Sequence, residues 1–371
     1  MIRKTTYMIL LVTVLAAPTA FGQVIYGQPT SGLVQFQYTD WTIEDDDGET
    51  TINQLAIPVS GFVPLQDNLE AMFYIANASN NLTENDTEYD LSGMSDFRIM
   101  FNKTYAGDQL VTSLAINLPT GKKQLDLEDE WLVVDYLSDN YLDFPIRRFG
   151  EGLGVSALLG MAGVSGNMRY GAGAMYQYNG SYEPYDGYDD YNPGDLFSFN
   201  VGAELQNEGF TLSGDIIFSL YTDDKADDVK IFKQGNQVDF RLQGMYGSER
   251  YTASGGIQYL ARGAQTGYDP ETENEVEKLK AYGNEFILHG MMSWSPAQHW
   301  LLSPAMDLRL ISANERGFDN SSIFGIGAVI GRGLGANLNF DLGFKYYVGS
   351  ADGGDLDLSG YRITGGLTGL I

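Results

Sequence analysis

The sequence predicts an all-β protein that folds as a single transmembrane antiparallel β-barrel of about 16 strands, with 14 strands as the alternative. Three observations support this prediction. Apolar and polar residues alternate over many segments, and long connections alternate strictly with short ones. The chain also holds 45 glycines, 24 tyrosines and 19 phenylalanines. Helical periodicity occurs in one region only, so we expect one helical segment, in the third extracellular loop.

The N-terminal segment has the three parts of a secretory signal. Arg3 and Lys4 precede the apolar run Met8–Pro18, and small residues follow it. The run is shorter than the roughly 20 residues that span a bilayer, which disfavours a membrane anchor. We therefore expect residues 1–22 to be a cleaved signal peptide and residues 23–371 to form the exported barrel.

Composition limits what the exported chain binds. The chain has 22 Lys and Arg against 49 Asp and Glu, so its formal net charge is -27. Nucleic-acid binding requires a basic surface, so we expect no nucleic-acid partner. Cysteine is absent, which leaves no thiolate metal site and no disulfide framework. We expect no cofactor.

Period-two alternation identifies the strands. In Ala336–Val348 the even positions are apolar and most odd positions are polar. This pattern indicates a strand with one face in an apolar environment and the other in water. The same pattern recurs in several segments: Phe197–Gln206, Phe210–Tyr221, Leu69–Ile75, Leu110–Leu118 and Tyr361–Ile371.

The connections sort by length. The short ones contain residues 66–68, 106–108, 165–166, 207–209, 247–249, 296–298 and 331–335. The long ones contain residues 44–49, 79–91, 119–150, 181–195, 223–228, 265–279, 314–320 and 350–355. A transmembrane barrel has this arrangement, with short periplasmic turns and long outer loops. Closing the sheet also removes edges that lipid cannot hydrogen-bond. We expect an outer-membrane location with both termini periplasmic.

Aromatic residues flank the short turns. Trp294 and Trp300 lie on either side of one turn, and Tyr246 and Tyr251 on either side of another. All four fall in the outward register, which predicts an aromatic girdle at the membrane interface.

Three D-x-R triplets place charges within strands. With Phe97, Phe240 and Leu308 facing lipid, the flanking acids and arginines face the lumen. A charge on the lipid face costs roughly 2 to 4 kcal/mol for Arg or Lys at the midplane, so this register is enforced. The predicted pore-lining residues are Glu70, Asp96, Arg98, Arg169, Glu204, Asp215, Asp239, Arg241, Asp307, Arg309, Asp341, Lys345 and Arg362.

Two uses of these inward charges remain open, and they are compatible. The charges can pair across strands and stiffen the wall, or they can line a path of water. A barrel of about 16 strands leaves an aqueous channel, whereas about eight strands leave an interior filled by side chains.

The third long connection, Pro119 to Gly150, holds the helical segment. Acidic and apolar residues mix at helical spacing over Leu127–Phe144, and Pro145 would end the helix. The segment caps the mouth, plugs the pore or folds inward and narrows it, and we expect inward folding. The predicted constriction residues, whose acids would meet the lumen arginines, are Asp126, Glu128, Asp129, Glu130, Trp131 and Asp135.

This architecture resembles the outer-membrane porins of Gram-negative bacteria over the whole mature chain. The resemblance rests on the signal, the strand count, the loop alternation and the long loop after the fifth strand, where general porins carry a constriction loop. The stretch NLPTGK, Asn117 to Lys122, is more weakly similar to uncharacterised transporters near the fatty-acid and aromatic-degradation channels. Two features depart from these patterns: the chain ends in Ile371 rather than Phe, and too few residues precede the first strand to form an N-terminal hatch.

Catalysis and metal binding are not expected. The only histidines, His289 and His299, lie away from the outer rim where a hydrolytic barrel would place its chemistry. Two oxygen-rich stretches, Asp45–Gly48 and Asp186–Asp190, lack the spacing of the helix-loop-helix calcium motif, so we interpret them as solvated loops. Whether divalent cations bridge these loops to anionic lipid remains open.

We therefore expect a porin-like channel in outer-membrane lipid that passes small hydrophilic solutes by diffusion. The acidic mouth predicts a weak preference for cations, because it raises the local cation concentration. One alternative is a plugged transporter of hydrophobic small molecules, and a second is a surface adhesin or structural barrel. Solute identity and homo-oligomer formation remain open.

Overall fold

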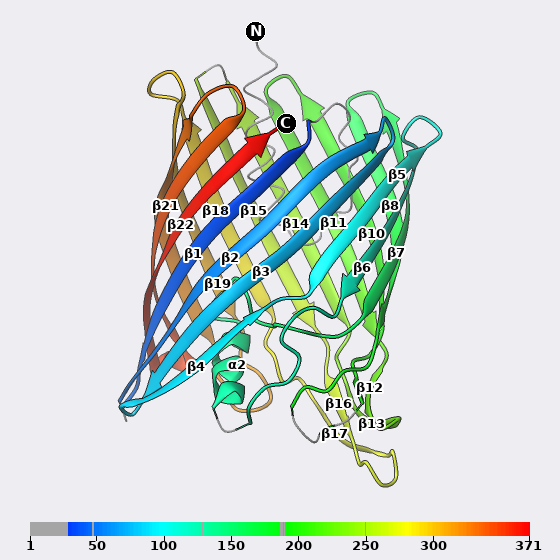
Figure 1. The fold of residues 1–371 in the computed structure, drawn as a ribbon, viewed down its shortest axis with the longest axis vertical. Helices are drawn as coiled ribbons and strands as arrows, with labels where there is room; N and C mark the ends of the chain where they lie inside the picture. The colour runs from blue at the N-terminus through cyan, green and yellow to red at the C-terminus, as the bar shows by residue number, and fades with distance from the viewer. Residues whose placement is uncertain (1–28, 47, 128, 186–187, 189, 249) are drawn as a thin grey trace.

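The computed structural model describes residues 29–46, 48–127, 129–185, 188, 190–248 and 250–371; the expected signal peptide lies outside them. The described chain forms a closed antiparallel barrel (Figure 1). The first strand, β1 (Ser31–Glu44), pairs with the last, β22 (Leu356–Leu370), from Ser31 and Leu370 to Glu44 and Asp357. This pairing closes the sheet, so the expected barrel is confirmed. Among the described residues, no helix is long and apolar enough to cross a membrane.

Between β1 and β22 the wall follows chain order. Its other strands are β2 (Glu49–Gln66), β3 (Leu69–Glu84), β4 (Thr87–Met94), β5 (Phe97–Tyr105), β6 (Leu110–Leu118), β7 (Gly154–Ser165), β8 (Met168–Asn179), β10 (Leu196–Asn207), β11 (Phe210–Tyr221), β14 (Gln237–Gly247), β15 (Tyr251–Arg262), β18 (Glu285–Trp294), β19 (Trp300–Ile311), β20 (Ser321–Gly333) and β21 (Leu338–Ala351).

These strands occupy 16 wall positions, which confirms the preferred strand number over 14. Strands β4 and β5 share one position, because both pair with β3. The wall is interrupted between them at Ser95 and Asp96, which belong to neither strand. This interruption lies beside the start of the long connection that follows β6.

The short turns and the long connections lie at opposite ends of the barrel. The end of β22 and the start of β1 share the end that carries the short turns (Figure 1). The prediction of a long loop at residues 79–91 is wrong. There β3 and β4 continue to a tight turn at Asn85 and Asp86, whose φ angles are 50° and 63°. The polar outward residues of this hairpin suggested a loop, whereas its inward residues Leu82 and Leu91 are fully buried.

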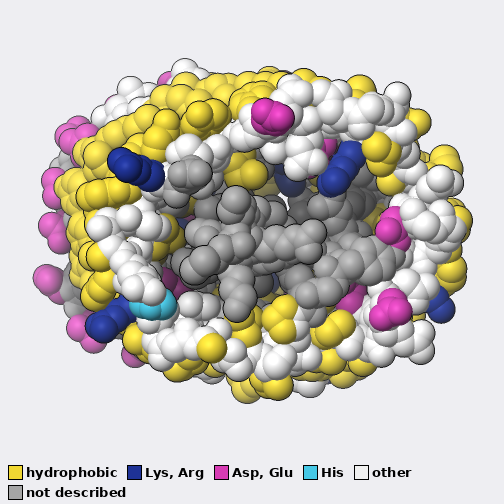
Figure 2. All heavy atoms as spheres, turned by 90° about the horizontal axis from the view of Figure 1, so that it is seen from above, with side chains coloured by type: hydrophobic (Ala, Val, Ile, Leu, Met, Phe, Trp, Pro, Cys, Tyr) yellow, Lys and Arg dark blue, Asp and Glu magenta, His cyan; other side chains and the backbone are white. Residues whose placement is uncertain are grey.

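The outer face of the wall is apolar. Large apolar side chains form an exposed belt around the barrel (Figure 2). Trp294 and Trp300 are 45% and 40% exposed, and the Arg332 guanidinium lies 4.8 Å from the Trp300 ring. The rings of Tyr246 and Tyr251 lie 6.0 Å apart. All four aromatics predicted for the girdle therefore lie near the short turns with exposed side chains.

Three smaller structures lie at the end that carries the long connections. Helix α2 (Glu130–Ser138) is shorter than the predicted Leu127–Phe144, because the chain leaves the helical path at Asp139, where ψ is 123°. A second sheet has the order β17-β16-β13-β12-β9. Its strands are β9 (Tyr191–Asn192), β12 (Asp223–Ala226), β13 (Val229–Lys233), β16 (Gln265–Tyr268) and β17 (Glu275–Leu279), and a 3-10 helix, η1 (Asp352–Gly354), precedes β22.

Candidate functional site in the barrel interior

The long connection between β6 and β7, residues 119–153, folds into the barrel; we call it the inserted loop. From α2 onward its apolar side chains join a buried core with inward residues of the wall. The loop contributes Val133, Leu137, Tyr141, Leu142, Phe144, Ile146 and Phe149. The wall contributes Trp41, Ile43, Ile52, Ala56, Ala76, Ala78, Leu82, Leu91, Ile311, Ile323, Tyr347, Ala351 and Leu358. This part of the interior is therefore filled by side chains.

A wall glutamine holds the loop backbone inside the barrel. The Gln54 side chain, 0% exposed, donates a hydrogen bond to the Ile146 carbonyl at 2.7 Å and accepts one from the Ile146 N–H at 3.0 Å. It also donates to the Asn80 side chain at 2.7 Å. These contacts satisfy polar groups of the loop that burial would otherwise leave unpaired.

Asp143 is the acid through which the loop meets the wall arginines. Its carboxylate lies 3.0 Å from Arg309 on β19, 3.4 Å from Arg362 on β22 and 3.7 Å from Arg147 of the loop. Burial alone would raise the pKa of Asp143, but the three guanidinium groups outweigh burial and hold this pKa well below its ordinary value. The carboxylate therefore stays ionised at neutral pH.

The same network continues along the wall. Glu285 on β18 lies 3.2 Å from Arg309 and 2.9 Å from Arg262 on β15. Arg309 also donates to the Asn140 carbonyl of the loop at 3.0 Å. Four strands and the inserted loop thus share one set of charge-assisted hydrogen bonds, which are stronger than bonds between neutral groups.

The three D-x-R triplets turn out to have three different roles. Asp239 accepts hydrogen bonds from Arg241 of the same strand and from Gln258 of β15, the latter at 3.0 Å. Asp307 pairs with Lys345 across the inner face, while Arg309 joins the Asp143 network. The three triplets therefore share the predicted inward register, but their charged groups have different partners.

Asp96, in the first triplet, lies in the wall interruption. Only 6% exposed, it accepts hydrogen bonds from the N–H groups of Gly121 and Glu151, both at 2.8 Å, and from the Asn117 side chain at 3.0 Å. Its carboxylate fastens both ends of the inserted loop to the wall between β4 and β5. It was expected to line the pore, but its two carboxylate oxygens are used by these contacts.

The other predicted pore-lining residues are spread over the inner face. Arg169 lies 3.5 Å from Glu204 near the short turns. Glu70 is buried and accepts from Asn102 at 2.9 Å. Three more have inward positions: exposed Arg98, Asp215 opposite Arg241, and Asp341 opposite Gly331 and Gly366.

Of the five described residues predicted for the constriction, four are exposed to solvent. Glu130 pairs with Lys122, and Asp129, Asp135 and Trp131 are exposed. Asp126 is exposed too, and Glu128 lies outside the described residues. Within α2, the burial of Val133 and Leu137 turns Trp131 and Asp135, on the other side of the helix, to solvent.

Sequence patterns alone missed Asp143 and Gln54. A lone acid within the apolar run YLDFPI, followed by Arg147 and Arg148, is the one local signal for Asp143. Gln54 carries no such signal, because its partner is the backbone of a segment remote in sequence.

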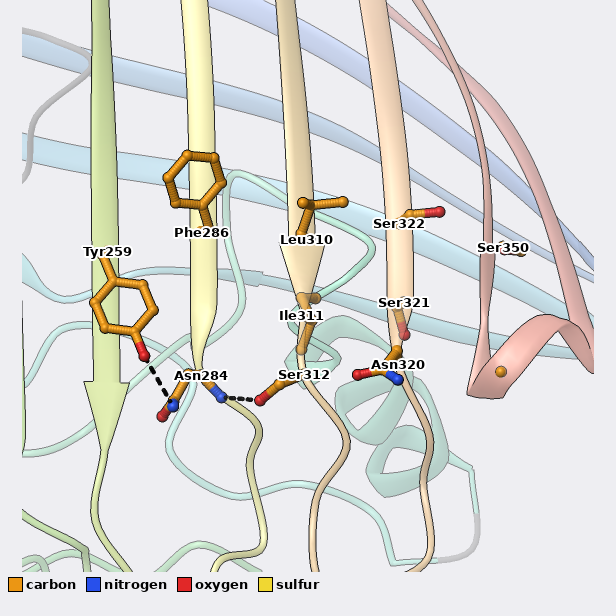
Figure 3. A pocket seen from close by; sticks show the side chains of 11 residues that line it. Tyr259, Asn284, Phe286, Leu310, Ile311, Ser312, Asn320, Ser321, Ser322 and Ser350 are labelled. Carbon is orange, nitrogen blue, oxygen red and sulfur yellow. Dashed lines mark hydrogen bonds between the residues drawn. The ribbon is translucent and has the colours of Figure 1, made fainter.

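A hollow of about 520 Å³ lies outside the interior, at the loop ends of β15 and β18 to β21 (Figure 3). Its apolar part includes Tyr259, Phe286 and Leu310. Its polar part includes Asn284, which donates to the Tyr259 hydroxyl at 3.1 Å and, through its backbone, to Ser312 at 2.8 Å. Among the described residues that line it none is charged, in contrast to the interior.

Solved structures with a similar fold include a FadL homologue of Pseudomonas aeruginosa, at 8% identity and a TM-score of 0.47, covering 92% of this chain and 90% of that one. Two others are outer membrane proteins by name. The opdK protein of Pseudomonas aeruginosa has 8% identity, a TM-score of 0.44 and coverages of 91% and 98%. A loop-deletion mutant of OmpT from Vibrio cholerae has 9% identity, a TM-score of 0.43 and coverages of 91% and 98%.

The sequence matches no protein-family model and no curated protein. At these low identities and TM-scores, the assignment of the fold rests on the strand pairing of the chain itself.

Proposed function

We propose that the chain is an outer-membrane channel through which small hydrophilic solutes diffuse, with a weak preference for cations. The observation that carries this proposal is a closed barrel with 16 wall positions, an apolar outer face and charged residues on its inner face. Barrels of this width enclose an aqueous interior. The short turns would face the periplasm and the long connections the cell exterior.

Exposed acids at the end with the long connections support the cation preference. They include Glu44, Asp45, Asp46 and Glu49 at the turn from β1 to β2, and Glu271, Glu273, Glu275 and Glu277 before and within β17. Fixed negative charge at a mouth raises the local concentration of cations. Most of the inner charges, in contrast, are paired with opposite charges.

A second function is favoured by the buried core of the inserted loop. A loop that fills part of the lumen with apolar side chains suits a plugged transporter of hydrophobic small molecules. In that case the Asp143 network would have to open during transport. The adhesin alternative has no comparable support within the barrel.

Single-channel recording of the protein in a planar bilayer, under a salt gradient, tests the proposal. We expect stable ohmic steps and a reversal potential whose sign shows cation preference. Anion preference at low salt would contradict the role of the acidic mouth. A folded barrel that carries no current, yet speeds the entry of a hydrophobic dye into vesicles, would favour the plugged transporter.

A further inference from the structure

The buried core inside the barrel is one-sided. Its wall members all come from β1 to β4 and from β19 to β22. Thr39, Gln54 and Ala78, which point inward on these strands, are 0% exposed. A core packed at the density of a protein interior leaves no room for hydrated ions. Passage along this side would therefore require the loop to move.

The opposite wall is different. Among their described residues, β7, β8, β14 and β15 contain none that is buried, and β10 and β11 contain one each, Ser198 and Ile217. We call the inner face of β10, β11, β14 and β15 the polar sector. Its side chains include Asn200, Gln243 and Gln258, all partly exposed.

Charge is arranged across the polar sector in a strip. Asp215 on β11 stands opposite Arg241 on β14, and Arg241 stands opposite Gln258 on β15. Asp239 accepts hydrogen bonds from Arg241 and Gln258. The Arg241 side chain is 25% exposed, against 14% for Arg309 in the loop network. A solute that passes this wall meets charges that remain partly hydrated.

Resting on the proposed channel function, we infer that the solute route runs along the polar sector rather than along the barrel axis, and that Asp215, Asp239 and Arg241 set its selectivity. The inserted loop does not narrow the pore evenly; it closes one side of it. Solutes then pass between the loop and the charged strip, where a partly exposed guanidinium and two carboxylates act on their charge.

The absence of cysteine makes the route directly testable, because any introduced thiol is unique. Gln243→Cys and Gln258→Cys place a thiol in the polar sector, and Gln243→Cys leaves the contact between Gln258 and Asp239 intact. Ala78→Cys places a thiol under the inserted loop, and Leu242→Cys places one on the lipid face beside Gln243. Each variant is recorded in a bilayer before and after a membrane-impermeant charged methanethiosulfonate is added.

We expect a stepwise loss of unit conductance in both polar-sector variants and no change at Ala78→Cys or Leu242→Cys. Arg241→Gln should shift the reversal potential toward stronger cation preference, whereas Arg332→Gln, on the outer face, should not. Block at Ala78→Cys, or no block at either polar-sector thiol, would overturn the route while leaving the channel function standing. An unmodified protein that carries no current would overturn both.

Discussion

The carboxylate of Asp143 on the inserted loop lies 3.0 Å from the guanidinium of Arg309 on β19 and 3.4 Å from that of Arg362 on β22. One side chain thus fastens the loop to two wall strands. Buried charge-assisted hydrogen bonds contribute about 1.5–3 kcal/mol each, and the partial exposure of Asp143 lowers that contribution.

Asp143→Asn keeps the size of the side chain and removes its charge. We expect a loosened loop, seen as larger and noisier single-channel currents and as faster protease cleavage within residues 119–153. Asp135→Asn, an exposed change in α2 of the same loop, should behave as the unaltered protein does. Equal current noise in the two variants would show that Asp143 does not hold the loop.

The loop should also respond to pH near neutrality through Asp139. Burial raises the pKa of Asp139 to about 6, the Tyr141 hydroxyl that donates to it at 2.8 Å opposes this rise, and nearby Asp135 adds to it. The folded loop therefore favours the protonated carboxyl. Its stabilising contribution is complete below the ordinary pKa of about 3.9 and disappears as pH rises through about 6.

We therefore expect current noise to increase from pH 5 to pH 7 in the unaltered protein and to stay constant in Asp139→Asn. Asp143 does not titrate in this window, because its pKa is held low. A noise that rises equally in Asp139→Asn would assign the pH dependence to another group.

The wall could be predicted from the sequence because each strand repeats one simple pattern. Alternation over Phe210–Tyr221 gives the bounds of β11, and alternation over Ala336–Val348 identifies β21 to within three residues. Outward apolar side chains and inward polar ones follow from a sheet that closes on itself between two environments. Such a pattern is local, so no knowledge of distant partners is required.

The inserted loop could not be predicted in the same way. Asp143 and Ile146 are held by Arg309, Arg362 and Gln54, which are remote in sequence, and no periodicity encodes such contacts. Asp96 was misassigned for a related reason. Its triplet suggested a strand, whereas the wall breaks there to receive the loop.

Asp96 gives a prediction for the wall interruption. Asp96→Asn turns one acceptor oxygen into a donor that faces the N–H and amide donors of Gly121, Glu151 and Asn117. A buried donor left without a partner costs about 1–3 kcal/mol. We expect a lower thermal midpoint and faster protease cleavage at the ends of the loop.

The matched control is Asp90→Asn on β4, an exposed acid that accepts a hydrogen bond from Asn81 at 3.1 Å. Its free energy of unfolding should change by no more than about 0.5 kcal/mol in either direction, as for other surface substitutions, so its thermal midpoint should stay close to that of the unaltered protein. Matching losses in the two variants would mean that Asp96 does not fasten the loop.

The buried core of the loop gives the last prediction, based on two leucines of the same loop. Leu142 is 0% exposed within the core, whereas Leu127 is 53% exposed. Truncating a buried leucine to alanine costs about 2–5 kcal/mol, from lost burial and from the cavity that remains. Leu142→Ala should therefore release the loop part of the time, which adds brief openings of higher conductance. Leu127→Ala should add none.

A thiol reagent gives a second measurement of the same opening. Because the core lies against β1 to β4 and β19 to β22, the added openings should let the reagent reach Ala78→Cys in the Leu142→Ala background and not otherwise. Unchanged protection of that thiol would show that the core stays closed without Leu142.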